Sequence, residues 1–573
     1  MGNTIILKMS CLMTLMPSLL KAQDIESVIK ADPLQVSGSV TNSNIWTKST
    51  NPDKDVDYSL YISGGVNLDF WNLVKVPLTF AYTNRELTKA CTSPFNRLSL
   101  TPQYKWVKAY IGYGSMSFSN YTMQGREFLG GGIELTPDGP WRFMAFGGRM
   151  QKAVEATEYT EASYKMRGGG FLIGYKAKYA TVSVNAIKVK DVDDSLPYMP
   201  GDSSYVSPRD NIASSISVEA HPLESMTIAG EFALSLLNRN CDADTTSNER
   251  IFDNSGDVVR YRAGKCSISQ RIPIGSVGFS YERVEPNYTT LGTFYNTDDF
   301  ERISLNMNLQ FGKVIQFGGD VGYQRDNLGN QDVNTNSQIA FSANLSVRPI
   351  EKLNIGFNAS NTQEYVHVRD IIEKITQTNE YQNLDTLSYT EMSLSLSSNI
   401  SYQIGSSDDG LPQSLSGAFS YQRASHDQEH YTRFVSNELF NANAAYSMRH
   451  VPTKISATLS VNWNNTKMPE SSSDVYTSTL TLSTPIARLV SLSSSVGYSI
   501  VKGSIESNVL NARLSATCSF LSHHNVNFNV SCVNNSSDVA KQKTQLSANL
   551  TYTYSFSCAL KRNDKHLSFK TEF

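Results

Sequence analysis

The last seven residues of the chain, LSFKTEF (567–573), alternate between two kinds of side chain. One face of an extended chain would carry Leu567, Phe569, Thr571 and Phe573, and the other would carry Ser568, Lys570 and Glu572. A period of two without a turn residue predicts a β-strand whose two faces meet different surroundings. The final aromatic residue is unusual, because domains in water commonly end in a polar tail. The ending therefore predicts a strand that is held in place.

The same alternation extends back through most of the chain. In Ile303–Gln310, Ile, Leu and Met alternate with Ser, Asn and Gln. Short turns that contain Pro, such as Pro349–Leu353 and Pro485–Leu489, alternate with long polar loops such as 238–257. Pro marks strand ends because it cannot donate to a ladder of hydrogen bonds. Short turns at one rim and long loops at the other predict an all-β fold, a large transmembrane antiparallel β-barrel of about 26 strands (roughly 24–28).

Composition agrees with a barrel wall. The chain is 40% hydrophobic with a mean hydropathy of -0.31, and no run of eighteen apolar residues predicts a membrane helix. A barrel needs apolar side chains only at alternate positions, so its average hydropathy stays low. The net charge of -3 gives no sign of a nucleic-acid partner. The seven cysteines have no repeating spacing, so neither a disulfide framework nor a zinc site is predicted, and no cofactor is expected.

The start of the chain predicts export. Residues 1–22 have the pattern of a secretory signal, with an early Lys8, an apolar run to Leu20 and an expected cut after Ala22. Residues 23–57 are then expected to form a periplasmic or lumen segment, with a first strand as one alternative, and residues 58–573 to form the barrel.

The ending resembles the C-terminal signal of bacterial outer-membrane β-barrel proteins, a terminal Phe preceded by apolar residues at alternate positions. That resemblance implies insertion into the outer membrane by the barrel-assembly machinery, with Leu567, Phe569, Thr571 and Phe573 as the signal. The block from Phe95 to Leu135 is similar to uncharacterised outer-membrane barrels of the Bacteroidota, which implies a fold and a location and transfers no activity. The outer membrane and its lipid bilayer are therefore the expected environment.

The direction of the last strand is a point of conflict. The alternation of turns and loops places the turn 561–564 at the short-turn rim, so the final strand would run outward. A terminal signal requires it to end at the periplasm. Either one strand is miscounted upstream, or the last segment is not a full member of the barrel.

A barrel of this width needs something in its lumen. Residues 23–57 are too few for the plug domain of a TonB-dependent receptor, so closure is expected from infolded loops, from residues 115–127, from the N-terminal stretch or from partner proteins. Gly130, Gly131 and Gly132 would let another segment pack closely against the wall. In the loop 364–387, the helical spacing of apolar residues, among them Ile371, Ile372 and Ile375, predicts a short amphipathic helix. This helix would either pack in the lumen or lie on the loop surface.

Candidate chemistry is weak. His426–His430 matches the inverted zinc-protease motif H-x-x-E-H. It lies in a polar loop, however, and no third zinc ligand is apparent at a characteristic spacing in the sequence. The aromatic loop Tyr288–Phe300 could instead dock a glycan or a protein. No enzymatic activity is expected. We predict a porin-like channel or transporter for small polar or amphiphilic solutes, with a lumen closed by segments of the protein itself. The alternative is a non-enzymatic barrel within an outer-membrane secretion or surface-glycan complex. Other outer-membrane or periplasmic proteins would then be its partners.

Overall fold

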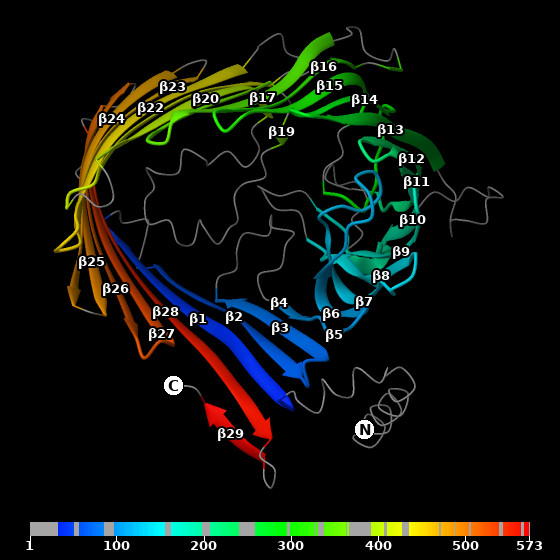
Figure 1. The fold of residues 1–573 in the computed structure, drawn as a ribbon, viewed down its shortest axis with the longest axis horizontal. Helices are drawn as coiled ribbons and strands as arrows, with labels where there is room; N and C mark the ends of the chain where they lie inside the picture. The colour runs from blue at the N-terminus through cyan, green and yellow to red at the C-terminus, as the bar shows by residue number, and fades with distance from the viewer. Residues whose placement is uncertain are drawn as a thin grey trace.

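The computed structural model describes most of the chain and forms one closed wall of strands (Figure 1). The residues described are 32–50, 57–84, 97–154, 162–196, 207–239, 258–294, 298–326, 328–329, 337–361, 364–365, 391–405, 410–426, 435–468, 471–487, 489–503, 506–537, 543–562 and 567–571.

The first half of the wall runs from β1 to β14. Its strands are β1 (Leu34–Ser49), β2 (Asp57–Phe70), β3 (Val74–Thr83), β4 (Arg97–Leu100), β5 (Gln103–Tyr104), β6 (Val107–Ser115), β7 (Glu127–Leu135), β8 (Trp141–Gln151), β9 (Met166–Lys176), β10 (Ala180–Asp191), β11 (Asp210–Leu223), β12 (Met226–Asn238), β13 (Val258–Ile272) and β14 (Gly275–Val284). A single turn of 3-10 helix, η2 (Asp193–Ser195), follows β10.

The second half runs from β15 to β29. Its strands are β15 (Phe300–Phe311), β16 (Ile315–Arg325), β17 (Ser337–Ile350), β18 (Leu353–Ser360), β19 (Glu364–Tyr365), β20 (Glu391–Ile404), β21 (Gln413–His426), β22 (Val435–His450), β23 (Ile455–Met468), β24 (Ser471–Ala487), β25 (Val490–Gly503), β26 (Ser507–Phe520), β27 (His524–Ser537), β28 (Lys543–Arg562) and β29 (Leu567–Thr571). Among the residues described, no helix is long and apolar enough to cross a bilayer.

The wall closes on itself as a barrel of 26 strands. Each strand pairs antiparallel with its neighbour in sequence, and β1 pairs with β28 from Leu34↔Leu560 to Ser49↔Gln545. At two places in the barrel wall, two short strands together occupy the place of one strand. β4 and β5 both lie between β3 and β6, and β18 and β19 both pair with β20. The predicted fold class and strand number are confirmed. The barrel begins at β1, inside the segment 23–57 for which a first strand was one alternative.

The last segment is not a full member of the barrel. β29 pairs only with the end of β28, from Cys558↔Thr571 to Arg562↔Leu567, in the part of the chain that is described. Because β27 pairs with β28 only as far as Tyr554, β29 extends the wall beyond the short turn between β26 and β27. This resolves the conflict over strand direction, since the barrel is complete without β29. Glu572 and Phe573 lie outside the described residues.

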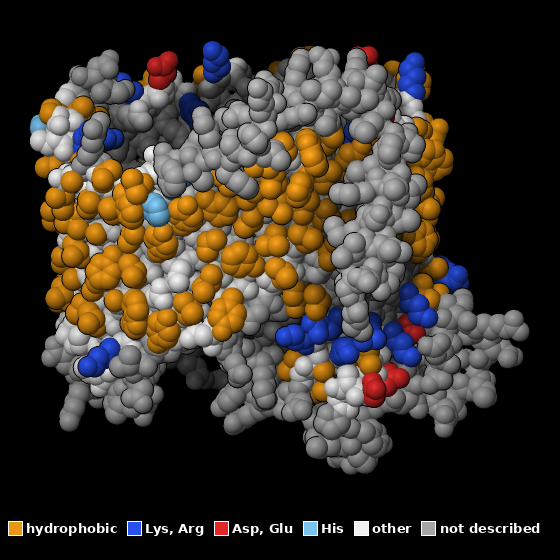
Figure 2. Space-filling model, turned by 90° about the horizontal axis from the view of Figure 1, so that it is seen from below, with side chains coloured by type: hydrophobic (Ala, Val, Ile, Leu, Met, Phe, Trp, Pro, Cys, Tyr) orange, Lys and Arg blue, Asp and Glu red, His pale blue; other side chains and the backbone are white. Residues whose placement is uncertain are grey.

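The outer face of the wall is an apolar belt. In β25, Val496, Tyr498 and Ile500 are 50%, 48% and 38% exposed, whereas the alternating positions are mostly serines that face inward. On the face seen in Figure 2, hydrophobic side chains form a broad band, and charged side chains gather along its two margins. A closed barrel has no unpaired edge, and this belt is the surface that hydrocarbon requires. The protein is a membrane-spanning β-barrel.

The alternation predicts a clear contrast between neighbouring positions of β24. Replacing Leu480, which is 47% exposed on the outer face, with Arg should destabilise the barrel in lipid by about 2 to 4 kcal/mol. Arg at the inward-facing Thr479 should cost less than about 1 kcal/mol, since the lumen is polar. Denaturant unfolding of both variants in lipid vesicles measures the difference. Equal losses would show that the two faces are not distinguished by lipid.

Candidate functional site: a plug on the inner wall

Two loops fold inward from the long-loop rim and lie against the inner face of the barrel (Figure 1). We call them the lumen plug, and they comprise residues 116–126, between β6 and β7, and residues 285–294, between β14 and β15. Thr122 and Met123 of the first loop are 0% exposed, and Thr290 of the second is 1% exposed. These residues of the plug are therefore as fully buried as those of a protein core.

The plug lies on apolar side chains that the strand pattern aims into the lumen. Met116 and Met123 of the first loop pack in one buried cluster with Phe128, Phe146 and other residues of the wall. The rings of Phe128 and Phe146 have centroids 4.9 Å apart. Lumen-facing positions such as Phe128 on β7 and Phe146 on β8 are thus apolar, because they are covered by protein and not by water.

Glycines on the lumen side provide the space for this packing. A Cβ at Gly132 would lie 2.7 Å from Cε of Met116, and one at Gly170 would lie 3.1 Å from the ring of Phe118. A Cβ at Gly130 would instead meet the backbone oxygen of Gly147 at 2.1 Å, while Gly131 lies on the opposite, outward parity. Of the three glycines named from the sequence, Gly132 thus lies directly beneath the plug.

Polar side chains fix the plug to β10, β11 and β12. Thr122 donates from Oγ1 to Oδ1 of Asn185 at 2.6 Å, and Asn185 donates onward to Ser215 at 2.7 Å. Asn211 accepts from the backbone nitrogen of Leu291 at 3.0 Å and donates to Ser235 at 2.8 Å. Both asparagines are at most 1% exposed. Because buried amides must be hydrogen-bonded, these contacts define where each loop lies.

Arg126 joins the two loops. Its Nη1 donates to the backbone oxygens of Leu291 and Thr293, both at 2.9 Å, and its Nη2 donates to Oε1 of Gln151 at 2.7 Å. The guanidinium also lies 4.9 Å from the ring centroid of Phe294. Burial lowers the pKa of Arg126 to about 10, so the side chain stays charged at neutral pH. A planar cation with several fixed donors suits two carbonyls in a turn.

Residues of the second loop also contact the backbone of the first loop. Tyr288 donates from its hydroxyl to the backbone oxygen of Tyr121 at 2.6 Å, and Thr290 donates to that of Thr122 at 2.8 Å. A Cβ at Gly292 would lie 2.1 Å from the backbone oxygen of Thr122 and 2.4 Å from Cδ1 of Ile187. Only glycine fits this contact.

One edge of the plug carries carboxylates. Tyr121 donates to Glu282 at 2.6 Å, and Ser119 donates to Glu231, which lies on β12. Glu282 also lies 3.2 Å from Nζ of Lys265. Burial, together with the two carboxylates, raises the pKa of Tyr121 far above its ordinary value, so its hydroxyl remains a donor. This edge therefore places two carboxylates beside the plug, apart from the cation of Arg126 between the two loops.

The inner wall across the barrel is polar and carries few charges, of which Arg513 on β26, opposite Ser495, is one. At the seam, Ser43 donates to Oδ1 of Asn549 at 3.1 Å, and the hydroxyls of Thr41 and Thr553 are 3.0 Å apart. The inward positions of β20 to β28 are mostly Ser, Thr and Asn. The barrel therefore has one sector covered by its own loops and another lined by side chains suited to water.

Part of the aromatic loop predicted to dock a partner lies inside the plug. Tyr288 and Leu291 are 2% and 4% exposed, so these two side chains are not available to a glycan or protein. Phe294 is 42% exposed, and docking at that end of the loop stays a prediction. Arg126 and Asn211 were not singled out from the sequence, because a polar residue that joins distant loops has no local signature. Residues 115–127 were among the segments that the sequence predicted to close the lumen.

Other predicted positions are not placed by the structure. Ile371, Ile372 and Ile375 lie outside the described residues, as does the motif beyond His426. Leu567, Phe569 and Thr571 belong to β29, and their role as an insertion signal stays a prediction. Within the described ranges, no group of three or more His, Cys, Asp or Glu side chains could hold a metal ion.

Comparison with known proteins gives similarity of fold. No family model and no curated protein matches this chain. The translocation pore of the P pilus usher PapC is 11% identical, covering 91% of this chain and 99% of that chain, with a TM-score of 0.36. The ferric enterobactin receptor PfeA of Pseudomonas aeruginosa in complex with enterobactin is 10% identical, covering 91% and 81%, with a TM-score of 0.40. An anion-selective porin from Comamonas acidovorans is 11% identical, covering 55% and 98%, with a TM-score of 0.32. Similarity at this level carries no function or ligand over to this chain.

Proposed function

We propose that the protein is an outer-membrane channel or transporter for small polar or amphiphilic solutes, with a lumen narrowed by its own loops. The observation that carries the proposal is the lumen plug, which covers one sector of a closed barrel whose other sector is polar with few charges. A wall lined mostly by Ser, Thr and Asn offers many hydrogen bonds and few fixed charges, which suits neutral polar solutes. The carboxylates Glu231 and Glu282 at the edge of the plug would disfavour anions there.

The proposal also sets the orientation. Both loops of the plug come from the long-loop rim, which in outer-membrane barrels faces the outside, while the short turns face the periplasm. Export through residues 1–22 and insertion by the barrel-assembly machinery, reading Leu567, Phe569, Thr571 and Phe573, complete this proposal. A solute would then meet the plug before it reaches the periplasm.

One observation favours the alternative, a non-enzymatic barrel within a multi-protein complex. β29 lies beyond the complete wall at the short-turn rim, and one of its edges pairs with no strand in the described part of the chain. An open strand edge is a common place for a partner strand to add. A periplasmic protein could dock there while the barrel serves as its membrane component.

Electrical recording in planar bilayers distinguishes these two functions. A channel should give stable single-channel steps from purified, heat-modifiable protein, and neutral polar solutes should pass in liposome-swelling assays. Folded protein that stays silent in both assays would contradict the channel and favour the complex.

A further inference from the structure

The short turns of the barrel carry large apolar side chains that are highly exposed. Leu521, between β26 and β27, is 71% exposed, and Ile486 and Leu223 are 63% and 61% exposed. Turns in water are usually built from Gly, Pro, Asn, Asp and Ser. We use the name apolar turn residues for six exposed side chains at six different short turns: Leu223, Ile274, Val314, Ile350, Ile486 and Leu521.

The backbone of two turns shows that a large apolar side chain is present there at a local cost. Leu521 has a φ of 52°, and Trp71, in the turn between β2 and β3, has a φ of 53°. This left-handed conformation favours Asn or Gly and is unfavourable for bulky side chains. The cost is offset if the surroundings of the turn stabilise an exposed apolar group.

The apolar belt reaches the short turns without a charged margin. On β16 the outward positions within 315–323 are uncharged, and the next outward residue toward the long loops is Arg325. On β25 the uncharged outward positions lie within 490–500, and Lys502 follows. Each run is about nine to eleven residues long, which is the length of strand that crosses a bilayer. The membrane must therefore begin at the short turns.

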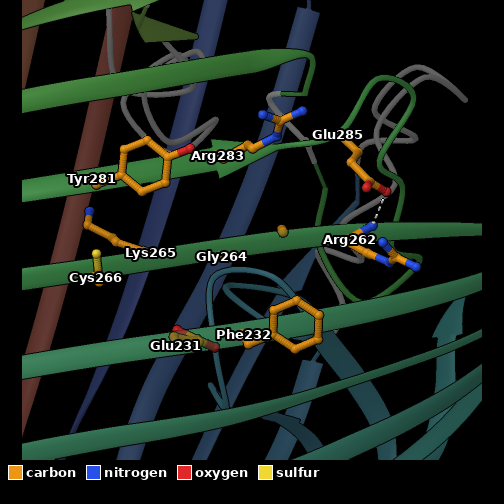
Figure 3. Close-up of a pocket in the computed structure, with 10 residues that line it drawn as sticks. Glu231, Phe232, Arg262, Gly264, Lys265, Cys266, Tyr281, Arg283 and Glu285 are labelled. Carbon is orange, nitrogen blue, oxygen red and sulfur yellow. Dashed lines mark hydrogen bonds between the residues drawn. The ribbon is translucent and has the colours of Figure 1, made fainter. Parts of the chain in front are cut away.

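The long-loop rim differs, because charged side chains occupy outward positions before the strands end. Figure 3 shows this change on β13 and β14, where Cys266 and Tyr281 are followed, toward the long loops, by Arg262 and Arg283. On β24 the outward Asp474 is reached while the strand still continues to Ser471. These strands thus extend beyond the belt on the long-loop side.

Polar groups in the short turns fit a position between hydrocarbon and water. Nζ of Lys178 lies 4.9 Å from the ring centroid of Tyr179, which is 59% exposed. In the turn between β15 and β16, Lys313 directly precedes Val314. A charge beside an exposed apolar group is typical of the layer where headgroups meet acyl chains, since each group finds its own solvent there.

We infer that the short-turn rim lies in the interfacial layer of the bilayer and that the apolar turn residues insert into its lipids. The geometry favours a lipid surface as the occupant, because the turns continue the belt without a charged break. A protein that covers the turns is the competing occupant. The inference needs the barrel to span a bilayer, and it is independent of whether solutes pass through the lumen.

Fluorescence quenching along one strand tests this inference. The full-length protein without its seven native cysteines receives one of three changes at outward positions of β24: Ile486→Cys at the short turn, Leu480→Cys in the belt, or Ser472→Cys beyond Asp474. Each cysteine carries an environment-sensitive fluorophore. The proteins are reconstituted in phosphatidylcholine vesicles with nitroxide-labelled lipid, or with iodide on both sides of the membrane.

The three positions should separate into two groups. We expect nitroxide-labelled lipid to quench positions 486 and 480 at least about fivefold more strongly than position 472, and iodide to show the reverse order. If position 486 is instead quenched like position 472, the inference is overturned, and the apolar turn residues are left as a surface for a protein.

Unfolding of two variants of one turn gives an independent measurement. Asn suits the left-handed φ of Leu521, so Leu521→Asn should stabilise a turn in water but weaken one that inserts Leu521 into lipid. We expect its urea midpoint in phosphatidylcholine vesicles to fall below that of wild type. Ser522→Asn, at the next residue with a φ of 58°, is the matched control and should unfold at the wild-type midpoint or higher. An unchanged or higher midpoint for Leu521→Asn, or an equal fall in both variants, would contradict insertion.

Discussion

Replacing Arg126 with Ala is expected to separate the two loops of the lumen plug and to raise the single-channel conductance. The guanidinium makes three charge-assisted hydrogen bonds, to Leu291, Thr293 and Gln151, at 2.7 to 2.9 Å. Its loss leaves buried carbonyl oxygens without a donor, which should cost about 2 to 4 kcal/mol of plug stability. Current recordings should therefore show larger or noisier steps than those of wild type.

Two further variants make this experiment specific. Arg126→Lys keeps the charge but has no planar fork for two carbonyls, so an intermediate conductance is expected. Arg142→Ala removes another lumen-facing arginine, one whose side chain is 53% exposed and pairs with Glu134, and should leave conductance near the wild-type value. If Arg126→Ala conducts like Arg142→Ala, the plug does not limit the current.

Replacing Gly292 with Val should be the most disruptive single substitution in the plug. The first added carbon would lie 2.1 Å from the backbone oxygen of Thr122, which is backbone and cannot rotate away. Overpacking of a close-packed site typically costs about 1 to 3 kcal/mol and sometimes more, and the upper end is expected here. The loop 285–294 should then leave the inner wall while the barrel remains closed.

Limited proteolysis and heat-modifiability check this result together. The variant should be cut within the plug loops and should still migrate as a folded barrel before heating. Gly139→Ala is the control, because a Cβ there has nothing within 4 Å. A variant at Gly292 with wild-type protease resistance would show that the two loops do not meet as described.

The wall of this protein could be predicted from its sequence because the rule is local. Alternation at Ile303–Gln310 places Ser304 inward and Ile303 outward whatever the rest of the chain does, and the structure has this arrangement. The number of strands follows from counting turns and loops. The end of the chain shows the limit of such counting, because β29 has a perfect strand pattern and yet lies outside the closed wall.

The plug could be predicted only in part. Residues 115–127 and the glycines beside them differ visibly from the surrounding strands, and Gly132 lies under Met116. The second loop gave no such signal, since Tyr288 and Leu291 look like residues of any exposed loop. Their partners are far away in the chain: Arg126 and Leu291 are separated by 165 positions. Contacts of that kind depend on barrel closure, which no local pattern encodes.

Thiol labelling in proteoliposomes tests the central claim most directly, namely that the two loops are packed inside the barrel in the membrane. In a background without the seven native cysteines, one cysteine replaces Thr122, which is 0% exposed, and in a second protein one replaces Ser495 on the polar inner wall of β25. A membrane-impermeant maleimide should label position 122 at least about 100-fold more slowly than position 495, because a packed site reacts only when it opens. Equal labelling rates would contradict the account.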